Sequence, residues 1–240
     1  MKATVVMCSY GYARWIAEAV DSVLDQDPPA GGFELVIVHR PSGDGTEEVL
    51  ARYAGDQRVR VLAQSGTGLP QAANQGLAAA AGDYVMRLDA DDVLLPGTLH
   101  AECGALDAHP GIGFVYGDAV YLFEDTGRRA RKPLPPYDPD ELASRGEFLT
   151  GATTWRRDVL ESLGGFDESL PTLEGYDLSL RMLDAGVMGI HLDMPAFEYR
   201  IHGASMSDET ELVRTTAEAI AARHGRVYER NANHPREYPS

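Results

Sequence analysis

Short apolar runs alternate with helix-periodic stretches in the first part of the chain, and this alternation is the strongest constraint on the fold. Four runs have the composition of buried β-strands: Thr4–Cys8, Phe33–Val38, Val59–Leu62 and Tyr84–Leu88. Three helical stretches separate them: Trp15–Leu24, Val49–Tyr53 and Leu69–Ala81. Strands and helices that alternate in this way form a mainly parallel sheet with right-handed crossovers. We therefore predict an α/β fold.

Length and charge limit the classes of protein that fit. The chain has 240 residues, 44% of them hydrophobic, so it can bury the core of one large α/β domain. Its formal net charge is -16 and its lysines are Lys2 and Lys132, so it has no broad basic surface and we expect no nucleic-acid partner. The one basic cluster, Arg128–Lys132, is interpreted as a solvated loop, with an anionic acceptor or a membrane surface as the weaker alternative.

Cysteine content and hydropathy indicate the cytoplasm. Cys8 and Cys103 are too few for a disulfide framework, and the first apolar run stops at Cys8, so we expect no signal peptide. No stretch approaches the roughly 20 apolar residues of a membrane span. We expect a cytoplasmic protein without a transmembrane segment. Its high Ala, Gly and Arg content with little Lys is typical of a GC-rich bacterial source.

Three carboxylates follow the fourth apolar run, in the sequence Asp89-Ala90-Asp91-Asp92. Residues i and i+2 of a strand share a face, so Asp89 and Asp91 are expected to converge on one cation while Asp92 supports it from the turn. Such hard oxygen ligands suit Mg²⁺ or Mn²⁺, which complete their shells with water and substrate phosphates. The cluster therefore predicts a divalent metal site.

Two other interpretations exist for the acidic cluster. The aspartates can solvate a loop and cap a helix that begins at Pro96. A calcium loop of the EF-hand type is disfavoured, because Leu94 stands where that loop needs glycine and His100 where it needs glutamate. The choice between a metal site and a capped loop depends on the rest of the chain.

Other candidate residues lie where predicted strands end. Ligands of open α/β sheets bind at the carboxyl ends of strands, which here carry Ser9-Tyr10-Gly11 and His39-Arg40-Pro41-Ser42 besides the acidic cluster. The segment Asp125–Arg145, rich in proline and charge, is predicted to be a long loop and a candidate lid. Three segments follow it, an apolar one and two predicted helices: Phe148–Trp155, Arg157–Leu163 and Glu174–Ala185.

Motifs of other nucleotide-binding and hydrolytic classes are incomplete or missing. Gly66-Thr67-Gly68 begins like a dinucleotide fingerprint, but Gln71 replaces the last glycine and Pro70 interrupts the loop. The sequence contains no Gly-Lys-Ser or Gly-Lys-Thr, no Gly-x-Ser-x-Gly and no His-Glu-x-x-His. A Rossmann dehydrogenase and a Walker-type nucleotide-binding protein are therefore disfavoured.

An ordered set of motifs resembles the family 2 glycosyltransferases of the GT-A fold, over nearly all of Thr4 to Ser207. Five similar segments lie in the first half: Val5–Tyr10, Asp44–Thr46, Ala72–Leu77, Asp83–Val85 and Leu88–Asp92. Four more lie in the second half: Val115–Asp118, Gly164–Glu168, Glu174–Leu178 and Tyr199–Ser207. Each motif is weak alone, and their shared order carries the resemblance.

The resemblance implies a Rossmann-like three-layer αβα fold with a central mixed, mainly parallel sheet. It implies one GT-A domain over residues 1–240, with a nucleotide-sugar-binding half (1–95), an acceptor-side half (96–207) and a helical, polar tail (208–240). The implied activity is metal-dependent, inverting transfer of a sugar from a nucleotide diphosphate sugar to an acceptor hydroxyl. A homodimer is a candidate assembly, and the sequence specifies neither the donor nor the acceptor.

The resemblance also assigns roles to particular residues. Mn²⁺ or Mg²⁺ would be held by Asp89, Asp91 and His202, with Asp91 as the principal ligand. The nucleotide sugar would contact Ser9, Tyr10, His39, Arg40, Asn74, Asp89, Ala90 and Arg200.

The sequence departs from the family pattern on both sides of the implied site. Relatives have Glu-Asp where this chain has Glu174-Gly175, so the usual position of the general base has no side chain. Glu174 and Asp177, three residues apart on one helix face, are the candidates for that role. On the donor side His39-Arg40 replaces two aspartates, which removes the carboxylate expected to accept the uracil N–H. Ala73 likewise replaces an arginine.

Because of these departures, two alternatives to a glycosyltransferase remain open. The first is a degenerate nucleotide-sugar-binding or scaffolding protein. The second is a sugar nucleotidyltransferase, which is less favoured because Cys8–Arg14 lacks a glycine-rich, basic loop for a triphosphate. The three aspartates and the segment Arg200–His202 are retained, which favours the transferase.

Overall fold

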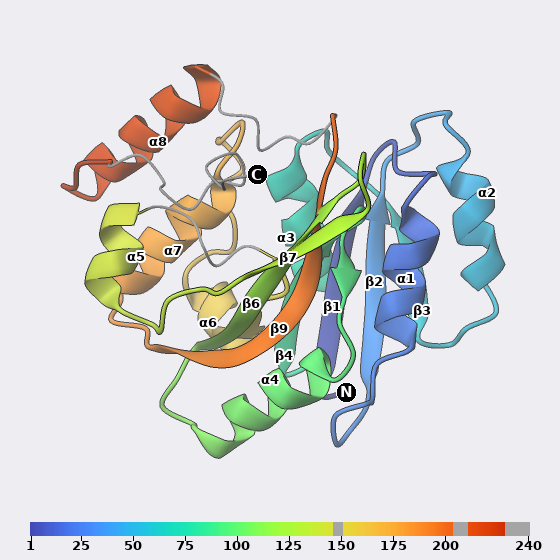
Figure 1. Cartoon of the computed structure of the whole chain (residues 1–240), viewed down its shortest axis with the longest axis horizontal. Helices are drawn as coiled ribbons and strands as arrows, with labels where there is room; N and C mark the ends of the chain where they lie inside the picture. Colours follow the sequence, from blue (N-terminus) through green and yellow to red (C-terminus); the bar gives the residue numbers. More distant parts are fainter. Residues whose placement is uncertain (146–150, 204–210, 229–240) are drawn as a thin grey trace.

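The computed structural model describes residues 1–145, 151–203 and 211–228, which fold around one twisted sheet (Figure 1). The strands are β1 Ala3–Ser9, β2 Phe33–His39, β3 Val59–Ala63, β4 Tyr84–Asp89, β5 Val93–Leu94, β6 Phe114–Phe123, β7 Arg128–Lys132, β8 Thr154–Arg156 and β9 Gly189–Ile201. The helices are α1 Ile16–Leu24, α2 Thr46–Leu50, η1 Ala51–Tyr53, α3 Leu69–Ala79, α4 Thr98–Ala108, α5 Pro139–Arg145, α6 Arg157–Ser162, α7 Glu174–Asp184 and α8 Glu211–Arg223. Among the described residues, no helix has the length and apolar character needed to cross a membrane.

The sheet is mixed and mainly parallel, as predicted. Its order is β3-β2-β1-β4-β8-β6-β9-β5, with β7 paired to β6. β1 runs parallel to β2 and β4, β2 to β3, and β6 to β9. The short strands β5 and β8 and the hairpin strand β7 pair antiparallel. The parallel pairings of β1 bring the carboxyl ends of β1, β2 and β4 to one edge.

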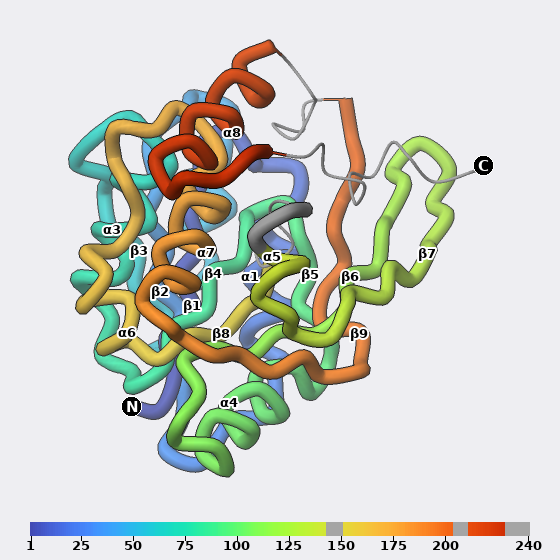
Figure 2. The backbone as a smooth tube through the Cα atoms, turned by 90° about the vertical axis from the view of Figure 1, so that its left-hand side faces the viewer, coloured from blue at the N-terminus to red at the C-terminus, as the bar shows by residue number. Residues whose placement is uncertain are grey.

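Helices cover both faces of the sheet, so the predicted three layers are confirmed (Figures 1 and 2). Alternate residues of β1 face opposite cores, because successive strand side chains point to opposite faces. Val5 and Met7 pack in the core that contains residues of α1 and α4. Val6 and Cys8 pack in the core that contains residues of α3, α6 and α7. The central strands are therefore buried on both sides, which explains their continuous apolar runs.

The elements predicted from the first half of the chain are present, with ends that shift by a few residues. The residues after β4 were predicted less completely, because the sequence did not indicate the short β5 or the strands β6 and β9. The predicted apolar segment Phe148–Trp155 ends in β8, and its residues 148–150 lie outside the described ranges. The same applies to residues 204–207 of the closing motif and to 208–210 and 229–240 of the tail, whose described part contains α8.

The prediction of a long loop at Asp125–Arg145 is wrong. A turn with Gly127 at φ +67 reverses the chain, β7 pairs with β6, and α5 follows. The basic cluster is therefore a strand and no solvated loop. Its charges are compatible with the sheet because Arg129 bonds to Glu198 on β9 and Arg131 bonds to the buried Asp118 on β6.

The closest approach between α3 and the sheet depends on Gly76. A Cβ atom built at this position would lie 2.3 Å from Cγ1 of Val6 on β1. Gly104 on α4 offers a matched control, because a Cβ there would meet nothing within 4 Å.

We expect Gly76→Ala to lower the free energy of unfolding by about 1–3 kcal/mol through overpacking. Gly104→Ala should raise it by about 0.5–1 kcal/mol, because alanine loses less backbone entropy in a helix. Urea unfolding followed by circular dichroism measures both. Equal effects of the two substitutions would contradict the proposed contact.

Glu102 is a fully buried carboxyl group between α4 and β8. One of its oxygens accepts a hydrogen bond from the Thr154 hydroxyl at 2.6 Å, and Oε1 has no hydrogen-bond partner. Burial raises the pKa of Glu102 well above its usual value, since no cation compensates a charge there. The folded protein therefore binds a proton that the unfolded chain releases above its ordinary pKa.

The pKa of Glu102 is higher in the folded protein than in the unfolded chain. Its contribution to the free energy of unfolding is therefore complete below the unfolded-state pKa and is lost as the pH rises through the folded-state pKa. We expect the free energy of unfolding of the wild type to fall between pH 5 and pH 8 more than that of Glu102→Gln, whose side chain does not titrate. Urea unfolding at both pH values provides the comparison. The same pH slope in both proteins would show that Glu102 titrates normally.

Candidate functional site

The predicted site residues of the first half gather at the carboxyl edge of the sheet. The register places Ser9 opposite His39 across β1 and β2, and Cys8 opposite Asp89 across β1 and β4. This arrangement follows from the parallel pairing of three strands whose ends carry polar residues. The acidic turn and the end of β2 therefore belong to one surface.

The acidic cluster forms a tight turn. β4 ends at Asp89, and the Asp92 N–H donates to the Asp89 carbonyl at 3.1 Å. The expected alternation of strand faces therefore does not extend to Asp91. Asp92 is 2% exposed and accepts a hydrogen bond from the Arg200 N–H at 3.0 Å. Burial, with the neighbouring Asp91 and Asp89, raises its pKa well above the usual value, so Asp92 has a structural role inside the turn.

Asp91 and His202 form the pair that fits a metal site. His202 Nε2 lies 2.9 Å from Asp91 Oδ2, although the residues are far apart in sequence. Oδ1 of Asp89 lies 3.5 Å from Arg87 Nε, and the expected contact of Asp89 with the cation stays a prediction. In the ranges described above, no three His, Cys, Asp or Glu side chains lie close enough together to hold one ion. A carboxylate and an imidazole nevertheless suit Mn²⁺, and a cation that retains water and substrate phosphates needs few protein ligands.

Trp15 fixes the orientation of the His202 ring. The two rings stack with centroids 4.2 Å apart and an interplanar angle of 25°. The Trp15 indole N–H donates to Glu124 Oε1 at 2.6 Å, at the end of β6. His202 is thus held between Asp91 and Trp15, which restricts the directions in which its nitrogen atoms can bind a ligand.

Arg200 holds the acidic turn in place. Its Nε donates to the Asp91 carbonyl at 2.8 Å, and a terminal nitrogen donates to Glu18 on α1 at 2.6 Å. The side chain of Arg200 is 8% exposed. We predicted a donor contact for Arg200; the structure shows it connecting β9, the acidic turn and α1.

The nucleoside-binding residues predicted at β1 and β2 divide into buried and accessible groups. The buried His39 has Nδ1 3.2 Å from the Ser9 hydroxyl and Nε2 3.6 Å from Oε1 of Glu47, whose side chain is exposed. Arg40 lies with its guanidinium 4.4 Å from the centre of the Tyr10 ring and donates to the Thr67 carbonyl. Tyr10 is 53% exposed. Of the four predicted residues, Ser9 and His39 are therefore buried, whereas Tyr10 and Arg40 are accessible.

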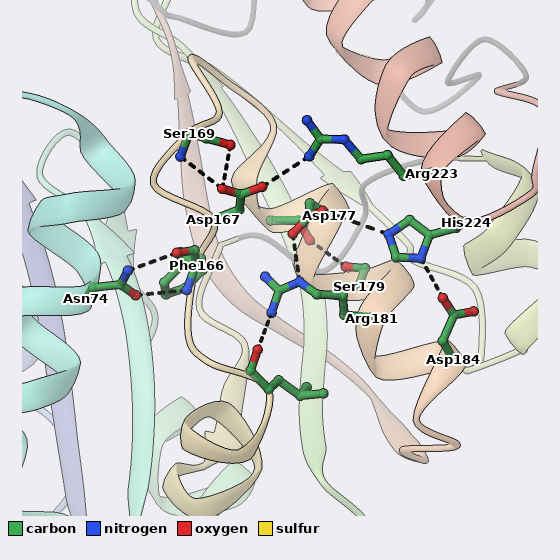
Figure 3. A network of polar contacts seen from close by, with 12 residues as sticks. Asn74, Phe166, Asp167, Ser169, Asp177, Ser179, Arg181, Asp184, Arg223 and His224 are labelled. Carbon is green, nitrogen blue, oxygen red and sulfur yellow. Dashed lines mark hydrogen bonds and ion pairs between the residues drawn. The ribbon is translucent and has the colours of Figure 1, made fainter.

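The two candidate bases on α7 have different surroundings. Glu174, the first residue of the helix, accepts a bond from Arg87 of β4 at 2.7 Å. Asp177 accepts a bond from Arg181 at 2.7 Å and lies 3.8 Å from His224, which follows α8 (Figure 3). Glu174 therefore faces β4, whereas Asp177 connects α7 with His224 after α8. The base role of either residue stays a prediction.

Asn74 joins α3 to the loop before α7. Its amide nitrogen donates to the Phe166 carbonyl and its oxygen accepts from the Phe166 N–H, both at 2.8 Å (Figure 3). The same nitrogen donates to Glu168 at 2.9 Å. We expected Asn74 to bind the donor, and that contact stays a prediction; the structure gives the side chain a role in holding the two halves together.

Arg87 and Trp15 were not predicted from the sequence as site residues. Arg87 is a lone charge in the apolar run Tyr84–Leu88, and such a residue in a buried strand needs a buried partner. That signal was present in the sequence. Trp15 was identified as part of a helical stripe, and its contact with His202 could not be read from local periodicity.

Comparisons with known proteins identify the family of the chain. A model of glycosyl transferase family 2 matches residues 4–164. EpsE of Bacillus subtilis strain 168, a candidate glycosyltransferase, is 30% identical over 205 residues, which cover 83% of this chain and 73% of EpsE. The O-antigen biosynthesis protein RfbC of Myxococcus xanthus is 31% identical over 76% of this chain, and the match covers 15% of RfbC. The matched segment thus spans most of EpsE and a small part of RfbC.

Solved structures share the fold. The S. aureus TarS fragment 1–349 in complex with UDP-GlcNAc superposes with a TM-score of 0.75 at 20% identity, over 97% of this chain and 69% of the fragment. The mannosyltransferase PcManGT of Pyrobaculum calidifontis, in complex with GDP-Man and Mn²⁺, gives 0.71 at 19% identity, over 97% and 67%.

The sheet topology and these superpositions show the GT-A fold. The chain belongs to glycosyl transferase family 2.

Proposed function

We propose that the protein is a metal-dependent, inverting glycosyltransferase that moves a sugar from a nucleotide diphosphate sugar to an acceptor hydroxyl. The observation that carries this proposal is the Asp91–His202 pair at the carboxyl edge, 2.9 Å apart and mostly shielded from solvent. In the neighbour PcManGT, Mn²⁺ accompanies GDP-Man, and TarS binds UDP-GlcNAc. A donor diphosphate at the same edge of this chain would meet Asp91 and His202.

Different residues of the chain have different roles in the proposed reaction. Asp91 and His202 would hold a divalent cation, preferably Mn²⁺ or Mg²⁺, which neutralises the charge that develops on the departing diphosphate. Arg200 and Asp92 keep the turn that carries Asp91 in one conformation. Tyr10 and Arg40 form the accessible surface for the nucleoside. A single displacement needs a base at the acceptor hydroxyl and inverts the anomeric carbon, without a covalent intermediate.

We assign the acceptor-side base to Glu174 and a structural role to Asp177. Arg87 connects Glu174 to the strand that ends in Asp89. Asp177 faces Arg181 and His224 at the boundary between α7 and α8. Gly175 carries no side chain at the position that the family resemblance gives to the base, and Glu174 is the adjacent carboxylate in the sequence. The cytoplasmic location, the homodimer and the division into halves stay predictions.

Thermal denaturation with UDP, TDP, GDP, ADP or CDP, each with and without Mn²⁺, tests the donor site. A ligand at 100 times its Kd stabilises the native state by about 2.7 kcal/mol. We expect one nucleotide to raise the melting temperature in a manner that requires Mn²⁺. Asp91→Asn should abolish the Mn²⁺-dependent part, while Asp193→Asn, on an 89% exposed side chain, should preserve it. No response to any nucleotide would favour a degenerate binding or scaffolding protein.

Single substitutions on α7 test the base assignment. We expect Glu174→Gln to reduce nucleotide release from the sugar nucleotide identified above by roughly 10²–10⁴-fold, because general base catalysis contributes that amount. Asp177→Asn should reduce it less than tenfold and should lower the melting temperature, since it breaks the contact with Arg181. Coupled assays of free nucleotide diphosphate measure the rates. The opposite order of effects would transfer the base role to Asp177.

A further inference from the structure

Arg87 is a buried cation in the middle of the sheet. It lies on β4 and is 6% exposed. Arg87 and Asp89 are two residues apart on this strand, so their side chains leave the same face. That face packs against α3, α6 and α7. A charge buried there costs free energy unless carboxylates compensate it, so its partners indicate why it is present.

The guanidinium contacts two carboxylates through different nitrogen atoms. One terminal nitrogen donates to Glu174 Oε1 at 2.7 Å, and Nε lies 3.5 Å from Asp89 Oδ1. Glu174 is 5% exposed, so Arg87 neutralises it in the interior. The planar guanidinium can serve two acceptors in fixed directions at once, which a lysine ammonium on a flexible stem cannot do with the same geometry.

Helix α7, which Arg87 contacts through Glu174, has no side-chain cap at its start. α7 begins at Glu174 after Leu173, which has φ 62 in the left-handed region, and no side chain caps the helix. A non-glycine residue in this region persists where the surroundings over-determine the conformation. Arg87 also lies 5.6 Å from the centre of the Phe166 ring, in the loop that Asn74 binds. The ion pair with Glu174 thus fixes the direction in which α7 starts.

We propose that Arg87 is a positioning residue that holds Glu174 of α7 at a set distance from Asp89 of β4. It thereby aligns the proposed acceptor side of the site with the donor side. The inference rests on the proposed glycosyl transfer. It predicts that the geometry of the arginine is required for turnover, beyond its charge. A purely structural ion pair would instead affect the amount of folded protein and leave the rate per folded molecule unchanged.

Arg87→Lys tests the proposal, because it keeps the charge and removes the two-pronged geometry. The matched control is Arg156→Lys on β8. Arg156 also bonds to several groups, the carbonyls of Ile112, Leu106 and His109, but it lies opposite Tyr84 at the far end of β4. The probe is the nucleotide that stabilises the wild type with Mn²⁺, and the activity is release of nucleotide diphosphate from the corresponding sugar nucleotide.

We expect Arg87→Lys to bind the nucleotide with a Kd within threefold of the wild type and to lose at least tenfold in kcat. Arg156→Lys should keep both values within threefold. Wild-type kcat in folded Arg87→Lys would overturn the positioning role and leave the transferase proposal intact. A wild-type protein that neither binds nor turns over any donor would instead overturn the transferase proposal, and the inference with it.

A second variant covers the case in which Arg87→Lys does not fold. Arg87→Gln removes the charge and shortens the side chain, but its amide N–H groups can still donate to Glu174, which stays in place as the proposed base. We expect it to fold, to keep the nucleotide Kd within threefold and to lose turnover. Turnover at the wild-type rate would contradict the proposal.

Discussion

The parallel pairing of β1 with β2 and β4 is the constraint on which the rest of the structure depends. It buries three strands on both faces, since alternate residues of β1 enter different cores. It also sets the carboxyl ends of the strands side by side, so that Ser9, His39 and Asp89 reach one edge. Hydrophobic burial determines the register, because a slip by one residue would exchange the faces of every side chain. The location of the site is thus a consequence of packing.

Buried charges then organise what the sheet brings together. Asp92, Arg200 and Glu18 connect the acidic turn with β9 and α1. Arg87 and Glu174 connect β4 with the start of α7. Each contact joins segments that lie far apart in sequence, and each is shielded from water on at least one side. Such groups are costly to bury unpaired, which explains why the turn and the helix start are held so closely.

A large part of the fold was predicted from the sequence. The strands of the first half and the helices α1, α3, α6 and α7 were predicted from periodicity, because their apolar faces pack locally against one sheet. The hairpin at β7 was missed, because its five residues are mostly charged and their partners, Glu198 and Asp118, come from other strands. Strand β9 lacked a local signal for a similar reason, since its pairing with β6 depends on distant residues.

The candidate site likewise has features that the sequence indicates and features that only the tertiary packing sets. The sequence alone determined that carboxylates follow a buried strand, that His202 belongs to a late motif, and that Gly175 leaves the usual base position without a side chain. The tertiary structure decided that Asp91 meets His202, that Asp92 is enclosed, and that Glu174 and Asp177 serve different neighbours. Composition and local spacing follow from neighbouring residues in the chain. The partners of a buried charge are set by how distant segments pack, which local patterns do not contain.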